Sequence, residues 1–292
     1  MLLVILNILT QICLLVKEKN FTKNNRKLRN SKLSARMTAM QKIAKIKGNA
    51  EIHLNDGSVG QATIEEMFQA GAHYGYGKPR RHPSVSPYIY ATKNKGDIID
   101  LEKTSVMLTS ALEFVKDLGA RGKTVLFVGT KPEAKETIKS GAIEINMPYV
   151  SVRWIGGTIS NFTEIKKRIN ELETYRKESV EGGLEKYTKK ERLVMAKKME
   201  KLDRYYSGLI SLKKAPDALF IIDPKAEHIA ATEARKAYIP VIALANSDSN
   251  IKGIDHPIIG NDASIPSIML FTTSIVNAYK AGTSSVPKKA EA

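Results

Sequence analysis

Three continuous apolar runs, each followed by a helical pattern, constrain the fold of this chain more than any other feature. The runs are TVLFV at 124–128, DALFIID at 217–223 and PVIALAN at 240–246. A strand of a parallel sheet reads this way because helices bury both of its faces. The following helices are predicted from Pro132 to about Glu144, from Ala226 to Lys236 and from about Ser264 to Ala281, with a short extra strand near Tyr149 to Val152. This alternation predicts an α/β fold with a three-layer arrangement.

The segment before the first run is richer in turn residues. Alternation in EIHLNDGSVGQA around Asp56-Gly57 predicts a β-hairpin. Thr63 and Glu66 have the spacing of a capping box for a helix that runs to about Ala70. The loop GYGKPRRHPSVSP then precedes two short strand candidates, YIYA and DIIDL. From Leu101 to Leu118 we predict a long helix with a buried face made of Val106, Leu108, Leu112, Val115 and Leu118.

Residues 161–214 contain no strand pattern at all. Apolar residues recur every three or four positions from Phe162 to Tyr175, Gly182-Gly183 interrupts them, and Thr188 with Glu191 forms a second capping box. The second arm steps through Met195, Met199, Leu202, Tyr206 and Leu209. These spacings predict an antiparallel coiled-coil hairpin that projects roughly 30 Å from the sheet. It carries fifteen Lys or Arg and nine acids, which fits either a solvated surface or contact with RNA or protein.

The net charge of +16 favours a polyanionic partner, because Lys and Arg gain affinity by releasing counterions from phosphates. Residues 1–47 account for ten of these charges, with eleven Lys or Arg against Glu18. The apolar run MLLVILNILTQICLLV is shorter than the ~20 residues that a spanning helix needs, and no cleavage site follows it. We expect translation to start at Met37 or Met40, with a membrane anchor or targeting segment as the alternative. The single cysteine, Cys13, lies in this leader, which fits a reducing cytoplasm.

A nucleotide-binding enzyme is the alternative functional hypothesis. The turn Gly129-Thr130-Lys131 after a buried strand, together with Asp223, imitates a phosphate loop and its magnesium-binding acid. The spacing does not match, because a phosphate loop wraps phosphates with several consecutive amides, whereas here one glycine is followed by Pro132. The pattern is more typical of a strand-to-helix turn.

The histidines and acids do not predict a metal centre. The five histidines are widely separated and none has the spacing of a ligand pair. Asp255, His256 and Asp262 could hold a divalent ion in a loop, but acidic loops after strands are common. We therefore predict no cofactor and no metal.

Two basic stretches with aromatic residues are the better site candidates. GKPRRHPSVSPYIY places Lys78, Arg80 and Arg81 on a proline-rich loop, and RWIGGTISNF places Arg153 and Trp154 before a glycine turn. Arginine pairs with phosphates and tryptophan stacks on bases. Trp154 fits core packing at the root of the hairpin equally well.

At these motifs the chain resembles a known family. The blocks GAHYGYGKPRRHPSVSPYIY, DIIDLEKT, ALEFV, LFVGTK, YVSVRWIGGTISNF, PDALFIIDPKAEHIAATEARKAYIPVIAL and PIIGNDA follow, in order, the pattern of the bacterial-type small-subunit ribosomal protein two, from about Ile64 to Tyr279. The resemblance implies a flavodoxin-like sheet with an inserted helical hairpin. It also implies a cytoplasmic, non-enzymatic structural constituent of the small ribosomal subunit, which binds ribosomal RNA between head and body and helps to anchor the OB-repeat first protein.

Carried over by position, the resemblance places six residues near RNA or at the root of the hairpin: Arg80, Arg81, Lys93, Arg153, Trp154 and Asn161. The full predicted set of RNA-binding residues adds Lys78, Lys95, Lys166 and Lys167. The chain departs from the family pattern at Tyr76, His82, Ser86, Asn246 to Asn250 and Ala263, which weakens any ion site in these loops and alters one RNA contact. The predicted organisation is a leader at 1–47, an α/β domain at 48–160 and 215–282, a hairpin at 161–214 and a flexible tail at 283–292.

Overall fold

The computed structural model describes residues 62–181 and 187–285, which belong to one compact unit. The predicted hairpin at Asp56-Gly57 and the leader therefore lie outside the described residues, and so do the tip of the 161–214 insertion and most of the predicted tail. The boundaries of the predicted domains stay predictions.

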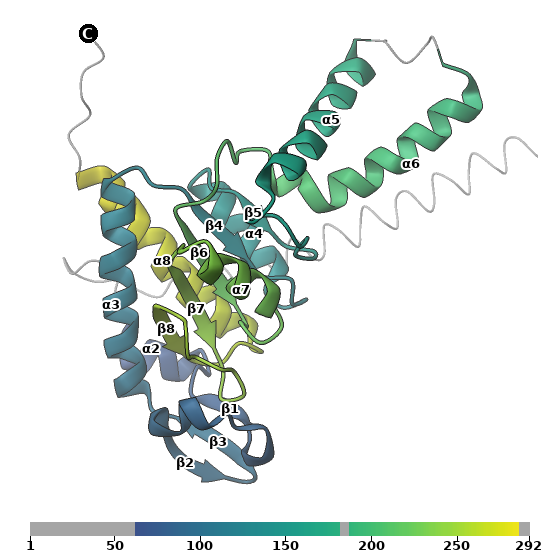
Figure 1. The fold of residues 1–292 in the computed structure, drawn as a ribbon. Coiled ribbons are helices and arrows are strands. Elements are labelled where there is room, and N and C mark those ends of the chain that lie inside the picture. Colours follow the sequence, from purple (N-terminus) through teal and green to yellow (C-terminus); the bar gives the residue numbers. More distant parts are fainter. Residues whose placement is uncertain (1–61, 182–186, 286–292) are drawn as a thin grey trace, which may run out of the picture. The chain divides into compact units, whose positions relative to one another are not determined.

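A five-stranded parallel sheet forms the centre of the fold (Figure 1). Its strands are β4 (Val125–Val128), β5 (Tyr149–Val150), β6 (Ala218–Ile222), β7 (Val241–Ala245) and β8 (His256–Ile259). They lie in the order β5-β4-β6-β7-β8, which is the flavodoxin-like order. The predicted fold class is confirmed. Sequence analysis missed β8, since this edge strand is four residues long and contains Pro257.

Helices cover both faces of this sheet, because successive strand residues point to opposite sides. Phe127 and Phe220 pack in a core with α3 (Leu101–Ala120), α4 (Lys135–Glu144) and α8 (Ile265–Ser285). Leu126 and Leu219 pack on the other face, which α7 (His228–Lys236) covers. All four of these strand side chains are fully buried.

One residue of the predicted buried face of α3 was assigned wrongly. Leu108, Leu112, Val115 and Leu118 are buried, but Val106 is 72% exposed. The buried stripe runs through Leu101, Thr104, Leu108, Ala111, Leu112, Val115 and Leu118, with Ala111 and Leu112 adjacent and the other steps three or four residues long. Val106 lies two positions before Leu108 and therefore on a different side of the helix.

Two glycines allow α3 and α8 to pack closely. A Cβ atom on Gly119 would lie 2.4 Å from the Tyr279 carbonyl oxygen, and one on Gly282 would lie 2.1 Å from the Lys116 carbonyl oxygen. Ordinary contacts are more than 1 Å longer, so neither position accepts a side chain without separating the helices.

A small antiparallel sheet precedes α3 and carries the first basic loop (Figure 1). After α2 (Ile64–Gln69), the chain forms β1 (Tyr74–Gly77), the short helices η1 (Lys78–Arg80) and η2 (Pro83–Tyr88), β2 (Ile89–Lys93) and β3 (Gly96–Ile99). Both hydrogen bonds of the predicted capping box at Thr63 and Glu66 are present. β1 was predicted as loop, because its sequence YGYG has the glycine content of a turn.

Two consecutive helices, α5 (Phe162–Val180) and α6 (Lys189–Tyr206), occupy the predicted insertion, and η3 (Ser207–Leu209) follows them. Ile165 and Ile169 of α5 pack into the core on the α7 side of the sheet. Side-chain bridges join α5 to α6, from Glu171 to Lys198 and from Arg176 to Asp203. The second capping box, at Thr188 and Glu191, is confirmed. Coiled-coil packing along the full length of the two helices stays a prediction.

Candidate nucleic-acid interface

The crevice where flavodoxin-like folds bind ligands is occupied here by the protein's own charges. Such ligands lie beyond the carboxyl ends of the strands, where the strand order reverses, which is between β4 and β6 in this sheet. Lys131 follows β4, and its Nζ lies 3.2 Å from an Asp223 carboxylate oxygen and 2.9 Å from an Asp262 carboxylate oxygen. The Lys131 ammonium also donates to the Tyr76 hydroxyl at 3.2 Å.

Lys131 forms its ion pairs in a largely buried environment. The Asp262 side chain is fully buried and accepts a second hydrogen bond, at 2.8 Å, from the Asn246 amide. Burial by itself would lower the pKa of Lys131, but the hydrogen bond to Asp262 and the charges of Asp262 and Asp223 raise that pKa above its ordinary value. Lys131 is therefore charged at neutral pH and directed at two carboxylates, and the nucleotide-binding alternative is not favoured.

The same region fastens the small sheet to the end of β7. The Tyr76 amide donates to the Ser247 hydroxyl and the His82 amide donates to the Ser247 carbonyl, both at 2.8 Å. Gly75 passes so close that a Cβ there would lie 3.1 Å from the Ser247 hydroxyl. The loop between Tyr76 and His82 is thus held at both ends by Ser247, two residues beyond β7.

Four predicted RNA-binding residues gather on this anchored loop and the neighbouring hairpin turn. Gly77 pairs with Gly96, and Lys93 pairs with Gly96 from the other side, so Lys78, Lys93 and Lys95 all lie at one end of the small sheet. Arg80 follows on η1, with its guanidinium 5.9 Å from the centre of the Tyr76 ring. All four are exposed, and none forms an ion pair within residues 62–181 and 187–285.

The turn that presents Lys95 has a demanding backbone. Asn94 and Lys95 have φ values of 53° and 65°, the left-handed conformation that a two-residue hairpin turn requires. Asparagine tolerates it well, whereas lysine does so less readily. The turn therefore holds the Lys95 backbone at the tip of the hairpin.

Arg81 is placed differently from its neighbours. Its Nε donates to an Asp97 carboxylate oxygen at 2.7 Å, and its Nη2 donates to Thr92 at 2.6 Å and to the second Asp97 oxygen. The hydrogen bond from Arg81 holds the pKa of the buried Asp97 carboxyl below its ordinary value. Arg81 is an internal anchor of the small sheet, and an additional contact with RNA stays a prediction.

The remaining predicted residues lie after β5 and on the first turns of α5. Arg153, Asn161 and Lys166 are exposed, and Asn161 stands before α5 with no side-chain capping bond. Lys167 is also exposed but pairs with Glu164 at 2.6 Å. Sequence analysis missed Glu233 of α7, whose carboxylate accepts from the amides of Gly157 at 2.8 Å and Ile159 at 3.2 Å and so shapes this loop.

Trp154 does not offer its ring for stacking in this structure. The residue is 5% exposed and packs in the core on the α7 side of the sheet, at the root of α5. Of the two readings of its sequence position, burial favours core packing. An apolar ring next to a glycine turn fits both readings until its neighbours are known.

The three residues considered as ligands of a divalent ion, Asp255, His256 and Asp262, each contact a different part of the protein. The Asp255 carboxylate accepts from the Val241 amide at 2.8 Å, the His256 ring stacks on Phe114 at 4.3 Å, and Asp262 binds Lys131. Across the described ranges no three His, Cys, Asp or Glu side chains are grouped for a metal ion. In the same ranges no helix is both long and apolar enough to cross a membrane.

Comparison with known proteins gives consistent matches. The family model described as Ribosomal protein S2 matches residues 67–282. A protein named small ribosomal subunit protein uS2 from Wolinella succinogenes is 42% identical over 220 residues, which is 75% of this chain and 81% of that protein. Proteins of the same name from Thermus thermophilus and Helicobacter hepaticus are 42% and 40% identical over 217 and 222 residues, with 85% and 84% of their lengths covered and 74% and 76% of this chain.

Proposed function

The chain belongs to the ribosomal protein S2 family and is a structural constituent of the small ribosomal subunit, and we propose that it is held there by phosphate contacts from its loops to ribosomal RNA. The observation that carries this proposal is the cluster of Lys78, Arg80, Lys93 and Lys95. These four cations are exposed and form no ion pair in the described residues, while hydrogen bonds from the Tyr76 and His82 amides to Ser247 fasten the loop that carries Lys78 and Arg80.

The proposed mechanism is electrostatic positioning. Lys and Arg side chains neutralise backbone phosphates and release counterions, and such contacts place a protein on RNA without reading its sequence. An anchored loop keeps its backbone in place, so little backbone conformational entropy is lost on binding. Arg81 stabilises the small sheet through its ion pair with Asp97. Lys131 stabilises the neighbouring crevice through its ion pairs with Asp223 and Asp262.

We place a second contact at Arg153, Asn161 and Lys166. These side chains are exposed on one loop and the adjoining helix end. Lys167 is the weaker candidate there, since Glu164 already neutralises it.

The protein is proposed to act by binding alone, in the cytoplasm, with neighbouring small-subunit proteins as further partners. Support for a non-enzymatic role comes from the ribosomal protein family and from the internally neutralised crevice at Lys131. The anchoring of the OB-repeat first protein stays a prediction from the family resemblance.

Sedimentation of ribosomal subunits tests the proposal. Tagged wild-type protein should travel with the small subunit in a sucrose gradient at low salt and be released as salt rises. A variant with Lys78, Arg80, Lys93 and Lys95 all changed to Gln should be released at lower salt, because fewer phosphates are neutralised. A matched variant at four exposed cations elsewhere, Arg121, Lys139, Lys177 and Lys236, should behave as wild type. Finding the wild-type protein only in the soluble pool would refute the proposal.

A further inference from the structure

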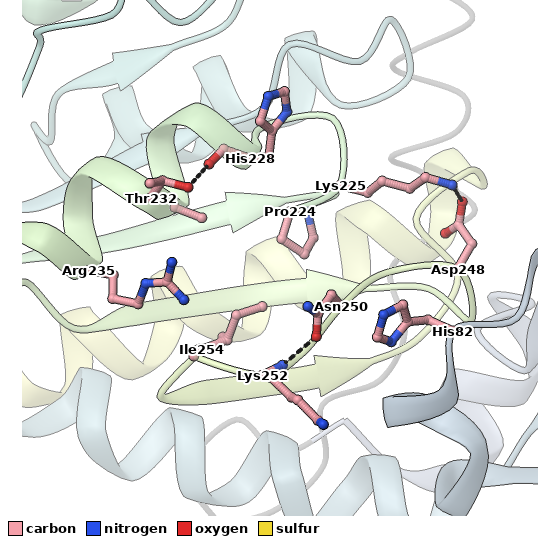
Figure 2. Close-up of a pocket in the computed structure, with 12 residues that line it drawn as sticks. His82, Pro224, Lys225, His228, Thr232, Arg235, Asp248, Asn250, Lys252 and Ile254 are labelled. Carbon is pink, nitrogen blue, oxygen red and sulfur yellow. Dashed lines mark hydrogen bonds and ion pairs between the residues drawn. The ribbon is translucent and has the colours of Figure 1, made fainter.

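A cavity lies beside the anchored loop and is not used by the contacts described so far. It has a volume of about 360 Å³ and lies between α7 and the loop that joins β7 to β8 (Figure 2). His82, which ends the basic loop, also lines it. Pro224, Ala231, Gly253 and Ile254 also line it, so the cavity has apolar as well as polar walls.

The lining of this cavity is cationic. Lys225 and Asp248 form an ion pair at 2.8 Å and cancel each other's charge. Arg235, from α7, and Lys252, from the opposite loop, form no ion pair in the described part of the chain. Two positive charges therefore remain without a counter-charge, with His82 and His228 as additional hydrogen-bonding groups.

Arg235 lies close to the backbone of Gly253. The guanidinium extends toward the loop that carries Ile254 (Figure 2), and a Cβ on Gly253 would lie 3.0 Å from its Nη1. Gly253 has a φ of +87°, which disfavours any other residue there. The glycine leaves room for the arginine head and for a ligand group beside it.

The start of α7 adds little to the attraction for anions. Residue His228 begins this nine-residue helix at the rim of the cavity, and the helix has no side-chain hydrogen bond at its N-cap. The N-terminal end of a helix carries a partial positive charge. The Asp223 carboxylate offsets this charge, because it accepts hydrogen bonds from the Lys225 and Ala226 amides at 3.2 Å just before α7. Arg235 and Lys252 therefore make the cavity complementary to a phosphate.

We propose that this cavity receives a phosphodiester group of ribosomal RNA, as a contact separate from the cluster at Lys78, Arg80, Lys93 and Lys95. The inference rests on the proposed function. RNA is favoured over a free phosphate because His82 joins the cavity to the basic loop, so one strand can reach both. Within the chain, His82 follows Arg80 by two residues and is held by Ser247.

This inference is tested by measuring the binding of the protein to small-subunit ribosomal RNA at several salt concentrations. The RNA is transcribed in vitro from the ribosomal RNA gene of the source organism. The full-length variant R235Q/K252Q should bind about tenfold more weakly, and the slope of log affinity against log salt should become shallower by about 1.4–1.8 if each cation neutralises one phosphate. The matched variant K139Q/K236Q removes two exposed lysines, one of them on α7 beside Arg235, and should keep the wild-type slope. Circular dichroism and thermal melting confirm that both variants are folded.

A tethered cleavage reagent gives a direct readout. With Cys13 changed to Ser, an iron chelate on Asn250→Cys should cut the RNA at discrete positions, and the same chelate on Lys139→Cys should not. Equal slopes for the pocket and control variants, or no cuts from position 250, would overturn the inference and leave the proposed function intact.

Inorganic phosphate separates the two phosphate sources. If millimolar phosphate raised the melting temperature of the wild type but not of R235Q/K252Q, while both bound RNA equally, the cavity would be a free-phosphate site and the inference would be wrong. Absence of salt-sensitive RNA binding by the wild type would instead refute the proposed function.

Discussion

Replacing Lys131 with methionine tests whether the crevice at the sheet edge is a structural lock. Methionine preserves most of the side-chain volume but leaves Asp223 and Asp262 facing each other without a cation. Removing one partner from a buried ion pair typically costs about 3–5 kcal/mol. Asp262 is 0% exposed and Asp223 13%, but Lys131 keeps 19% of its side chain exposed, so solvent screening places the expected loss at about 2–4 kcal/mol.

Urea unfolding at pH 7 measures this loss. With a typical slope of about 2 kcal/mol per molar, the midpoint should fall by about 1–2 M. Lys139→Met is the control, since Lys139 is exposed on α4 and forms no ion pair with any described residue. Its midpoint should stay within experimental error of the wild type.

The pH dependence gives the sign of the effect. The raised pKa of Lys131 means that its contribution is fully present below the ordinary lysine pKa of 10.5 and is lost as pH rises through the folded value. In the Lys131→Met variant, burial raises the pKa of Asp262 and no ammonium opposes this shift. Acidification therefore neutralises the Asp262 carboxyl and reduces the difference in urea midpoint between the variant and the wild type. If the midpoint of the variant were unchanged at pH 7, or if its difference from the wild-type midpoint grew on acidification, Lys131 would not have the proposed stabilising role.

Two further substitutions test the parts that position the loops. Asp97→Asn should destabilise the protein by about 2–3 kcal/mol at pH 7, because Arg81 loses its buried partner. The pKa of Asp97 is lowered in the folded state, so the stability that the pair contributes is present above the ordinary value of 3.8 and is lost as pH falls through the folded pKa. Urea titrations that give the same difference in unfolding free energy between wild type and Asp97→Asn at pH 7 and at pH 2.5 would contradict this. Gly119→Ala should lower the thermal stability by about 1–2 kcal/mol, because overpacking against the Tyr279 carbonyl outweighs the better helix propensity of alanine. Gly141→Ala in α4, whose Cβ would meet only methyl groups at 3.1 and 3.3 Å, should change stability little; equal melting temperatures for the two alanine variants would show that α3 and α8 separate freely.

Much of the fold could be predicted because burial on both faces leaves a strong sequence signal. The runs that became β4, β6 and β7 are apolar at every position, and the two capping boxes mark the starts of α2 and α6 through side chains three residues apart. The elements that were missed, β1 and β8, have four residues each and contain glycine or proline, so their pairing partners decide their conformation.

The candidate site divides in the same way. Lys78, Arg80, Lys93 and Lys95 could be chosen from basic and turn-forming sequence, although their grouping depends on the pairing of Gly77 with Gly96. The roles of Arg81 and Trp154 could not be separated from those of their neighbours, since an internal ion pair and a core position have no local pattern.

By itself, the sequence determined the α/β class, the two helices of the insertion and the basic character of the loops, because hydrophobic period, capping and charge are properties of neighbouring residues. Only the tertiary structure decided which charges are free to meet an external partner. Lys131 and Arg81 face the buried carboxylates of Asp262 and Asp97, which lie 131 and 16 positions away along the chain. Arg235 and Lys252 line a cavity whose one carboxylate, Asp248, is paired with Lys225. Charge pairing acts through space over a few ångströms, and sequence separation carries no information about it.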